Sequence, residues 1–233
     1  MVQPPVENES GMPSSEPAYA RTIGAIGALA WERLTEQECI STAWAYYFFS
    51  IQFRESLLAA RRLHPQDEKL QDLERGECDT DNLSPWPGVA DAGEAMNHDE
   101  FMRRAVELAA IPEDRRQDFE QRGQSYLRVT RAMDDETRAM SIASYEDGGL
   151  EHVFGAMLRM PASQHPTLAA FRHFLAEHIR FDSNPDEGHG ALARHLQPDD
   201  RIKPLWDAFH DLLVAFAPSL AAAKAVPARV LAS

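Results

Sequence analysis

The sequence predicts an all-helical protein, and three observations support this. From Ala18 onward, apolar residues recur at intervals of three and four, the spacing that gathers them on one face of an α-helix. No segment alternates apolar and polar residues as a half-buried strand does. Most connections are short, and Pro, Asp or Thr stands where several helices begin. The 233 residues fit one helical bundle, which we expect to span residues 18–233.

The expected helices follow one another along most of the chain. Residues 1–17 contain four prolines and little to bury, so we expect a disordered tail there. Thr35 and Glu38 have the spacing of a capping box, which predicts the start of a long helix. The irregular segment 78–96 is long enough for a lid or binding loop, although a plain surface excursion is the alternative. The expected helices are 19–34, 35–63, 66–76, 97–110, 113–132, 134–159, 167–182, 190–196, 200–217 and 219–224.

The charge of the chain argues against nucleic acid as a partner. It carries 37 acidic and 23 basic residues, a net charge of −14, with no basic stripe to attract phosphates. No apolar stretch reaches the length of a membrane helix and no secretion signal is visible, so we expect a cytoplasmic protein. The two cysteines form neither a disulfide framework nor a zinc motif, and bystander thiols are the default interpretation.

Several imidazole and carboxylate side chains are candidate metal ligands. His178 and Asp182 are four residues apart, so a helix would place both on one face. Together they suit iron, manganese or zinc, although a hydrogen-bonded surface pair is the alternative. Glu74, His98 and Glu146 fall on other expected helices, and bundles build metal sites from side chains that several helices project inward. For Glu74 and His98, a solvated surface position is the alternative.

In this order the residues resemble the heme-oxygenase-like diiron oxidases and oxygenases, relatives of the thiaminase-II and pyrroloquinoline-quinone-synthase fold. The resemblance covers roughly residues 40–196: a Glu-x-Gly helix end, a His before an acidic helix start, and a Glu in a long helix. The sequence His-Ile-Arg-Phe-Asp, followed by Gly-His-Gly, is its most diagnostic part. The resemblance implies a heme-oxygenase-like bundle that holds two irons per chain, with manganese as an alternative. The implied ligands are Glu74, His98, Glu146, His178, Asp182 and His189.

The sequence departs from the family pattern at two places. The family usually places its last His two or three residues beyond the Asp, whereas six residues, including Pro185, separate His189 from Asp182 here. The interval from Glu74 to His98 is also long, because the irregular segment lies between them. The alternative carboxylates are Glu77, Asp91 or Glu94 in place of Glu74, and Glu55 as an additional ligand.

The resemblance also implies the type of reaction. Such an enzyme activates O2, takes electrons from a donor and oxidises a small organic substrate, either derived from an amino acid or similar to a fatty acid. The aromatic segment 44–57 reads mainly as core, but in the resembling fold its helix also lines the substrate cavity. Arginine can hold a substrate carboxylate through two parallel hydrogen bonds. The candidate substrate-binding residues are Tyr47, Gln52, Arg54 and Arg180.

Two other functions remain open at this point. A cofactor-free or thiol-dependent enzyme of the same fold would use His178 and Glu146 for acid–base chemistry. A non-catalytic helical protein that binds a hydrophobic ligand would account for the aromatic helix and leave the candidate ligands as coincidence. The sequence leaves the substrate, the electron donor and a homodimeric state undecided.

Overall fold

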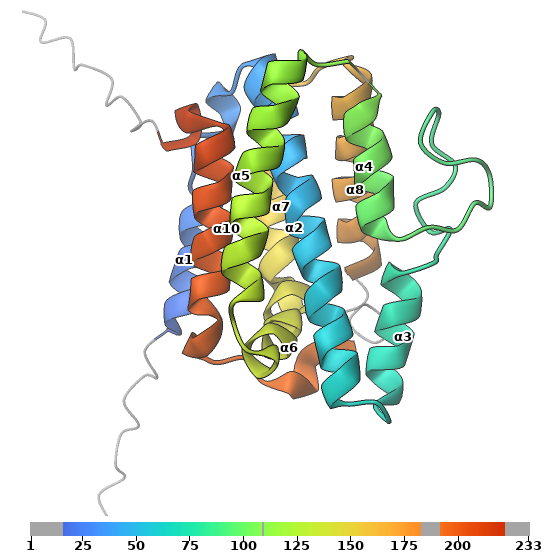
Figure 1. The fold of residues 1–233 in the computed structure, drawn as a ribbon, viewed down its shortest axis with the longest axis vertical. Helices are drawn as coiled ribbons and strands as arrows, with labels where there is room; N and C mark the ends of the chain where they lie inside the picture. The colour runs from blue at the N-terminus through green and yellow to red at the C-terminus, as the bar shows by residue number, and fades with distance from the viewer. Residues whose placement is uncertain (1–15, 109, 183–191, 222–233) are drawn as a thin grey trace, which may run out of the picture.

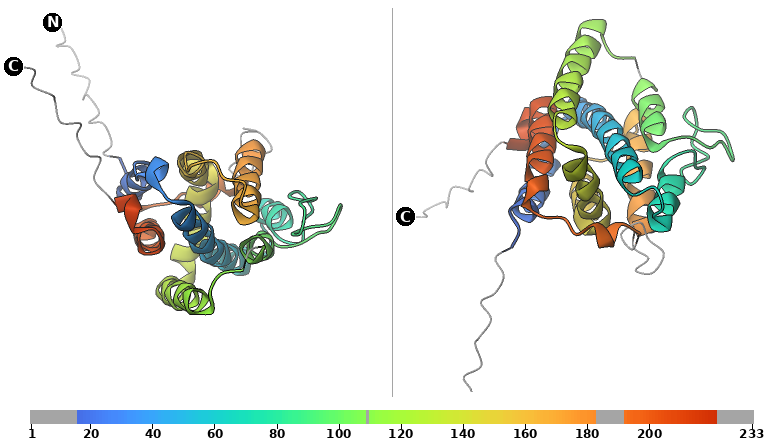
Figure 2. Two further views of the ribbon diagram at one scale, coloured as in Figure 1. Left: turned by 90° about the horizontal axis from the view of Figure 1, so that it is seen from above. Right: turned by 60° about the horizontal axis from the view of Figure 1, so that its bottom comes forward.

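The computed structural model describes residues 16–108, 110–182 and 192–221 (Figure 1). Within these ranges the chain is all-α, and the only β-type pairing is two isolated bridges. The helices form a bundle around α2 (Glu36–Leu63), which the view from above in Figure 2 places between the others. No described helix combines the length and apolar character needed to cross a membrane. The predicted all-α bundle is confirmed.

The remaining helices surround α2 or cover its neighbours. Those packed against α2 are α3 (Glu68–Glu77), α4 (His98–Glu107), α5 (Glu113–Arg131), α6 (Asp135–Ser144), α8 (Pro166–Asp182) and α10 (Lys203–Phe216). The helices α1 (Ala18–Gly27) and α7 (Leu150–Met157) contact each other, and they also contact α10 and α8 respectively. Short 3-10 turns connect or end helices at Trp31–Arg33, Arg194–Leu196, Asp200–Ile202 and Pro218–Ala221.

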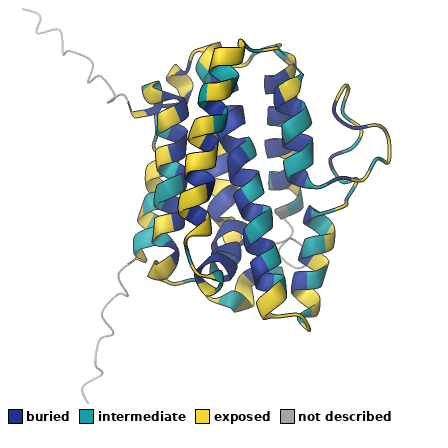
Figure 3. Cartoon of the chain, in the orientation of Figure 1, coloured by how far each residue is buried: buried dark blue, intermediate teal, exposed yellow. Residues whose placement is uncertain are grey.

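Helix α2 begins at the predicted capping box. The Thr35 hydroxyl accepts a hydrogen bond from the Glu38 N–H (3.3 Å), and the Glu38 carboxylate accepts one from the Thr35 N–H (3.1 Å). Most of the helix is buried, as the dark blue core of Figure 3 shows. Phe49 stacks on Phe209 of α10 with 4.0 Å between ring centroids. Tyr46 also contacts Phe209, together with three further rings, Phe154, Phe171 and Phe174. The aromatic segment is therefore mainly core, as predicted.

Two expected helices are interrupted. The first ends at Gly27 rather than residue 34, and the Ile26 carbonyl at its end accepts from the Leu29 N–H (3.2 Å) and from the Trp31 indole N–H (3.0 Å). The expected helix 134–159 is divided by a π-helical segment, Tyr145–Gly149, between α6 and α7. Inside it Gly148 has φ +90°, a conformation that residues with a Cβ adopt at a cost, so the α-helix cannot continue.

Two further expected helices near the C-terminus are described only in part. Of 190–196, Leu192 and Ala193 are α-helical and Arg194–Leu196 form a 3-10 turn, and of 219–224 the described residues belong to the 3-10 turn Pro218–Ala221. The other predicted helices are present, with ends that differ by a few residues. Most of the expected N-terminal tail lies outside the described residues.

The irregular segment 78–96 is present as predicted and is closed at its base. Thr80 and Met96 exchange two backbone hydrogen bonds of 3.1 and 2.9 Å, so the end of α3 and the start of α4 are held together. Trp86, farther along the segment, stacks on His173 of α8 with 4.4 Å between centroids. The segment therefore bridges the three helices α3, α4 and α8. Its predicted role as a lid stays a prediction.

Candidate metal centre

Three buried side chains from three helices meet at one point. Glu77 is the last residue of α3, His98 the first of α4, and His178 lies in the last turns of α8. The His98 Nδ1 atom lies 2.6 Å from Glu77 Oε2 and 3.0 Å from His178 Nε2. One ligand atom of each residue lies within 4.8 Å of the other two, and each residue is 5 % exposed. These three residues are called the Glu–His–His cluster below.

A hydrogen-bond chain fixes the orientation of the His98 ring. The Asn82 side-chain amide donates from Nδ2 to the Gly76 carbonyl (2.9 Å), so its Oδ1 faces His98 Nε2 at 3.0 Å. That oxygen can only accept, and therefore we assign the proton of neutral His98 to Nε2. The Nδ1 lone pair of His98 then faces Glu77 and His178.

The His178 ring is held in a similar way. Its Nδ1 lies 2.8 Å from the carbonyl oxygen of Phe174, one turn earlier in α8, so Nδ1 is the donor and Nε2 carries the lone pair. The ring also stacks on Phe174 with 4.0 Å between centroids. Hydrogen bonds on the outer nitrogens of both rings are the arrangement that orients metal-binding histidines.

Two imidazole lone pairs and a carboxylate oxygen therefore point at one another. Three such Lewis bases repel unless a cation, either a proton or a metal ion, lies among them. Two nitrogens bound to one metal at about 2.1 Å are separated by about 3.0–3.4 Å, which agrees with the 3.0 Å between His98 and His178. The cluster thus has the donor types and the spacing of a metal site.

Glu146 lines the same pocket as the cluster and is equally buried. It belongs to the π-helical segment Tyr145–Gly149, and π-bulges within α-helices often occur at functional sites. Tyr46, Phe53, Leu150 and Phe174 supply apolar walls. The cavity volume is about 20 Å³, which is room for a water molecule or an ion. A fourth potential ligand therefore faces a narrow, largely apolar cavity.

The last two predicted ligands are Asp182 and His189, and the structure describes only the backbone of Asp182. Asp182 ends α8, four residues after His178, so its backbone lies on the same helix face. Its side chain and all of His189 lie outside the described residues. Both assignments stay predictions.

The structure places the predicted ligand Glu74 away from the cluster, and this corrects the preferred assignment. The Glu74 carboxylate accepts a hydrogen bond from Arg61 of α2 (2.9 Å), whereas Glu77, one turn later, lies in the cluster. Residues three apart differ by about 60° around the helix axis and by about 4.5 Å along it, so the two carboxylates point to different neighbours. Glu77, an alternative in the sequence analysis, is therefore the carboxylate that the structure brings to His98.

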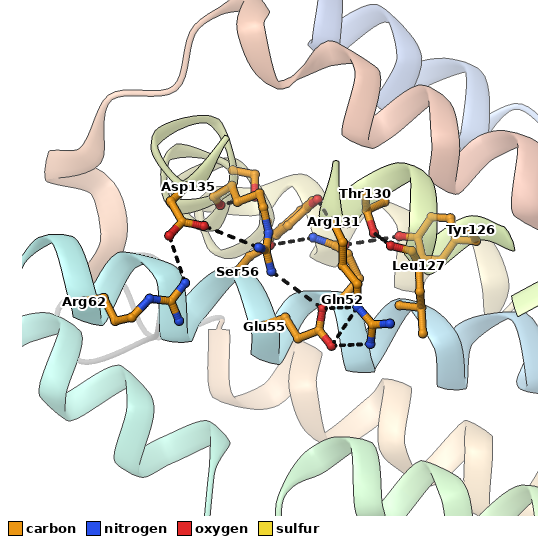
Figure 4. Close-up of polar contacts among 12 residues, drawn as sticks. Gln52, Glu55, Ser56, Arg62, Tyr126, Leu127, Thr130, Arg131 and Asp135 are labelled. Carbon is orange, nitrogen blue, oxygen red and sulfur yellow. Dashed lines mark hydrogen bonds and ion pairs between the residues drawn. The ribbon is translucent and has the colours of Figure 1, made fainter. Parts of the chain in front are cut away.

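The other alternative carboxylates also lie elsewhere. Glu55 faces α5 and α6, where it contacts Arg131 and Arg138, as Figure 4 shows for Arg131. Glu94 bonds Arg104 (2.8 Å) and the Asp91 N–H (2.9 Å) within the irregular segment and α4. These contacts occupy the carboxylates of Glu55 and Glu94, and neither residue lines the pocket. Asp91 is exposed and does not line it either.

The four candidate substrate-binding residues have different surroundings. Arg54 lines the pocket. Gln52 does not: it donates to Ser56 and accepts from the hydroxyls of Tyr126 (3.2 Å) and Tyr145 (3.4 Å) in the network of Figure 4.

The other two also lie away from the pocket lining. Tyr47 is half-buried and packs on Trp44 and Phe48. Arg180 is exposed and pairs with Glu177 (2.5 Å). Of the four, Arg54 is the residue that the structure places at the pocket.

Sequence reasoning missed three polar residues of the site, Asn82, Cys78 and Asp99. Asn82 has no local signal, since its role depends on a contact with His98, sixteen residues away. Asp99 and Cys78 follow directly after His98 and Glu77, and both line the pocket. Burial, together with the charge of Glu77, raises the pKa of the Cys78 thiol to about 12, so this thiol is protonated at neutral pH. Burial likewise raises the pKa of Cys39, within the core part of α2, to about 11.

Comparison of the chain with protein-family models, with curated proteins and with solved structures finds no significant match. The resemblance to heme-oxygenase-like diiron enzymes therefore stays a hypothesis that rests on the residues named above.

Proposed function

We propose that this protein is a non-heme iron enzyme of the heme-oxygenase-like diiron type, which uses O2 to oxidise a small organic substrate. The observation that carries the proposal is the convergence of a carboxylate and two imidazole lone pairs from three helices. A set of two histidines and one carboxylate with open positions is typical of non-heme iron oxygenases. Zinc and manganese accept similar donors, so the choice of iron rests on the resemblance.

The proposed ligands fall into two groups. Glu77, His98 and His178 would hold one iron, and Glu146 faces the same pocket and would contribute to a second. Asp182 and His189 complete the second group in the sequence-based proposal. Bound iron would supply O2 activation and the transfer of electrons that the oxidation requires, with an external donor of electrons.

The protein's own side chains would prepare the site for this chemistry. Asn82 and the Phe174 carbonyl hold the two imidazoles with their lone pairs inward, so little reorganisation is needed on metal binding. The apolar side chains of Phe53, Leu150 and Phe174 line the pocket and would limit the access of water to the cluster.

A metal-free acid–base enzyme is the second candidate, and one observation favours it. His98 Nδ1 and Glu77 Oε2 lie 2.6 Å apart, so a shared proton could replace the metal and the pair could move a proton to or from a substrate. A metal-free acid–base mechanism gives no role to the His178 Nε2 lone pair, which also faces His98 Nδ1.

Oxygen consumption separates the two candidates. The protein is loaded anaerobically with ferrous iron, given ascorbate as the reductant, and mixed with O2. We expect iron-dependent O2 uptake above the buffer rate for the wild type, and its loss in His178→Gln and Asp182→Asn. His152→Gln, at an exposed position of α7, is the matched control and should behave as the wild type. Equal uptake by all four proteins would contradict the proposal, because the uptake would then not depend on the site.

A further inference from the structure

The cavity beside the Glu–His–His cluster has one partly exposed side. Most of the described residues that line it are buried, and those that are partly exposed are Arg54, Cys78 and Asp99. Cys78 directly follows Glu77 and Asp99 directly follows His98, so both lie beside the cluster. Within the described part of the chain, the way from solvent to the cluster therefore leads between Arg54, Cys78 and Asp99, which are called the mouth of the cavity below.

An ion pair crosses this mouth. Arg54 of α2 donates from Nε to Asp99 Oδ1 of α4 (2.9 Å), and the two side chains are 33 % and 12 % exposed. The charges of both residues act on the Cys78 thiol, which lies beside them. Asp99 is the one hydrogen-bonding partner of Arg54 among the described residues. A single contact therefore decides whether the guanidinium lies across the mouth or turns out to solvent.

The fold does not need this ion pair to hold α4 against α2. Phe101, Met102 and Ala105 of α4 are fully buried, and α4 packs directly on α2. Burial of such side chains stabilises the contact far more than a partly exposed ion pair does. The arginine stem is long and flexible, so its charged end can reach solvent without help from the backbone. The pair can therefore break and re-form while both helices stay in place.

The size and charge of the cavity make this contact important for a metal ion. The volume of about 20 Å³ fits an ion, and the three cluster residues are 5 % exposed, so an ion cannot reach them from the surface without passing the mouth. With the pair intact, an incoming cation meets a charge of its own sign on Arg54. With Arg54 turned outward, the Asp99 carboxylate is free beside His98 and attracts the cation instead.

We propose that the ion pair between Arg54 and Asp99 is a gate, which closes the cavity to solvent and limits the rate at which a divalent metal ion enters and leaves the cluster. The gate acts on rates more than on affinity, because neither residue belongs to the cluster. The inference rests on the metal site of the proposed function, but opening of the gate can be measured without metal.

Labelling of Cys78 in the metal-free protein reports whether the gate is open. The probe is methyl methanethiosulfonate, which is small and uncharged, and peptide mass spectrometry identifies the labelled cysteine. We expect Cys78 to react about threefold faster or more in Arg54→Met than in the wild type. Loss of the Arg54 charge alone would slow the reaction: burial raises the pKa of this thiol, and the Arg54 charge lowers it and so favours the reactive thiolate.

Two controls accompany the labelling. Cys39 is 1 % exposed in the core part of α2, so it should stay unreactive in every folded variant and would reveal unfolding. Arg62→Met, at an exposed position of the same helix, should behave as the wild type. High salt weakens a partly exposed ion pair and should speed the labelling of the wild type, but not that of Arg54→Met.

Release of bound Zn²⁺ to an excess of a chelator tests the gate on a metal ion. Arg54→Met should take up and release Zn²⁺ faster, again by about threefold or more, with a much smaller change in the dissociation constant. If Arg54 acted only through its charge, its removal would strengthen cation binding and slow the release. Arg54→Lys keeps an ion pair with Asp99 and should lie closer to the wild type.

The partner residue gives an independent test. Asp99→Asn weakens the same contact and should also speed the labelling of Cys78. The double variant Arg54→Met with Asp99→Asn should label no faster than the faster single variant, because one change already opens the gate. Rates that multiply in the double variant would indicate two separate disturbances and would contradict a gate made by this pair.

Three further results would overturn the inference: equal labelling of Cys78 in Arg54→Met and the wild type, labelling of Cys39 together with Cys78, or slower release of Zn²⁺ from Arg54→Met. If iron binds and O2 uptake depends on the cluster while none of these rates responds to Arg54, the proposed function survives and the inference fails. If labelling responds to Arg54 but the protein binds neither Zn²⁺ nor Fe²⁺, the pair remains the gate of the cavity and the proposed function fails.

Discussion

The Nε2 atom of His178 lies 3.0 Å from Nδ1 of His98, although 80 residues separate them in the chain. The two rings stand at 71° to each other with 4.6 Å between centroids, because α8 and α4 pack side by side against α2. Both histidines were predicted ligands, whereas Glu77, the carboxylate beside His98, was predicted only as an alternative to Glu74.

Glu77→Gln is expected to weaken metal binding strongly. Glutamine has the shape of glutamate but carries no charge and is a poor ligand for a divalent metal, so the cluster would lose its anionic donor. We expect at least about a tenfold loss of Fe²⁺ or Zn²⁺ affinity, measured by titration against a competing chelator.

Glu74→Gln is the control for this change. It makes the same substitution one turn earlier in α3, at a residue that pairs with Arg61 rather than with the cluster. We expect its metal affinity to equal that of the wild type. A loss in Glu74→Gln with none in Glu77→Gln would restore the original sequence-based assignment.

Asn82→Leu is expected to weaken metal binding without removing a ligand. The variant loses the oxygen that accepts from His98 Nε2. The His98 ring can then turn, and its proton can move from Nε2 to Nδ1, where it blocks the metal-binding lone pair. Loss of such an outer partner typically costs about 10–100-fold in metal affinity. Asn82→Asp keeps an acceptor and should lose less. Equal affinities in all three proteins would show that Asn82 does not orient His98.

Gly149→Ala is expected to disturb the position of Glu146. A Cβ at residue 149 would lie far inside van der Waals contact of the Ser144 backbone carbonyl, because the π turn brings these two positions together. We expect lower thermal stability and weaker binding of a second metal.

Gly155→Ala, in α7, is the control, since its Cβ would meet nothing within 4 Å. This change should leave metal binding intact and stabilise the helix by up to about 1 kcal/mol. Full metal binding and wild-type stability in Gly149→Ala would refute the structural role of the π turn.

These variants also mark where sequence reasoning succeeds and where it stops. The helical periodicity predicts α2, α5 and α8 well because their apolar faces are regular, and it proposes His98 and His178, which the fold brings together. The choice between Glu74 and Glu77 depends on how α3 is rotated against α4, which no local pattern encodes.

The prediction of one continuous helix over 134–159 was wrong for a different reason. Its Asp147-Gly148-Gly149 sequence is a recognisable helix-breaking signal, and it could have been used. The role of Asn82 could not be predicted, because it arises when the irregular segment folds back on itself between α3 and α4.

Gln52→Leu is expected to destabilise the fold without affecting metal binding. The change leaves the hydroxyls of Tyr126 and Tyr145 buried without the amide oxygen that accepts from both. Tyr145 keeps its hydrogen bond with Ser141, so Tyr126 is the hydroxyl that loses its acceptor. An unsatisfied buried polar group costs about 1–3 kcal/mol, and we expect a loss of this size in chemical denaturation. Leu57→Met, a core change of similar volume on the same helix, should cost less. A reduced metal stoichiometry in Gln52→Leu would indicate that the network supports the site.

Asp67 gives the stability a specific pH dependence. Burial raises its pKa, but hydrogen bonds from the Leu70 N–H and from His195 outweigh this, and the pKa lies below its ordinary value of 3.8. Asp67 therefore contributes stability at pH values above 3.8, which is lost as the pH falls through the lower pKa of the folded state.

Asp67→Asn isolates this contribution, because asparagine can still cap α3. We expect the variant to be less stable than the wild type at neutral pH by a fraction of a kcal/mol. The difference should shrink in denaturation curves as the pH falls below 3.8. A difference that grows on acidification would contradict the assignment.

Anaerobic titration of the metal-free protein with ferrous iron tests the central claim most directly. Bound iron is counted per chain, and the titration is repeated with Glu77→Gln. The account predicts about two irons per wild-type chain, with specific binding lost or halved in the variant. No specific uptake by the wild type, or the same uptake by both proteins, would contradict a metal centre at Glu77, His98 and His178.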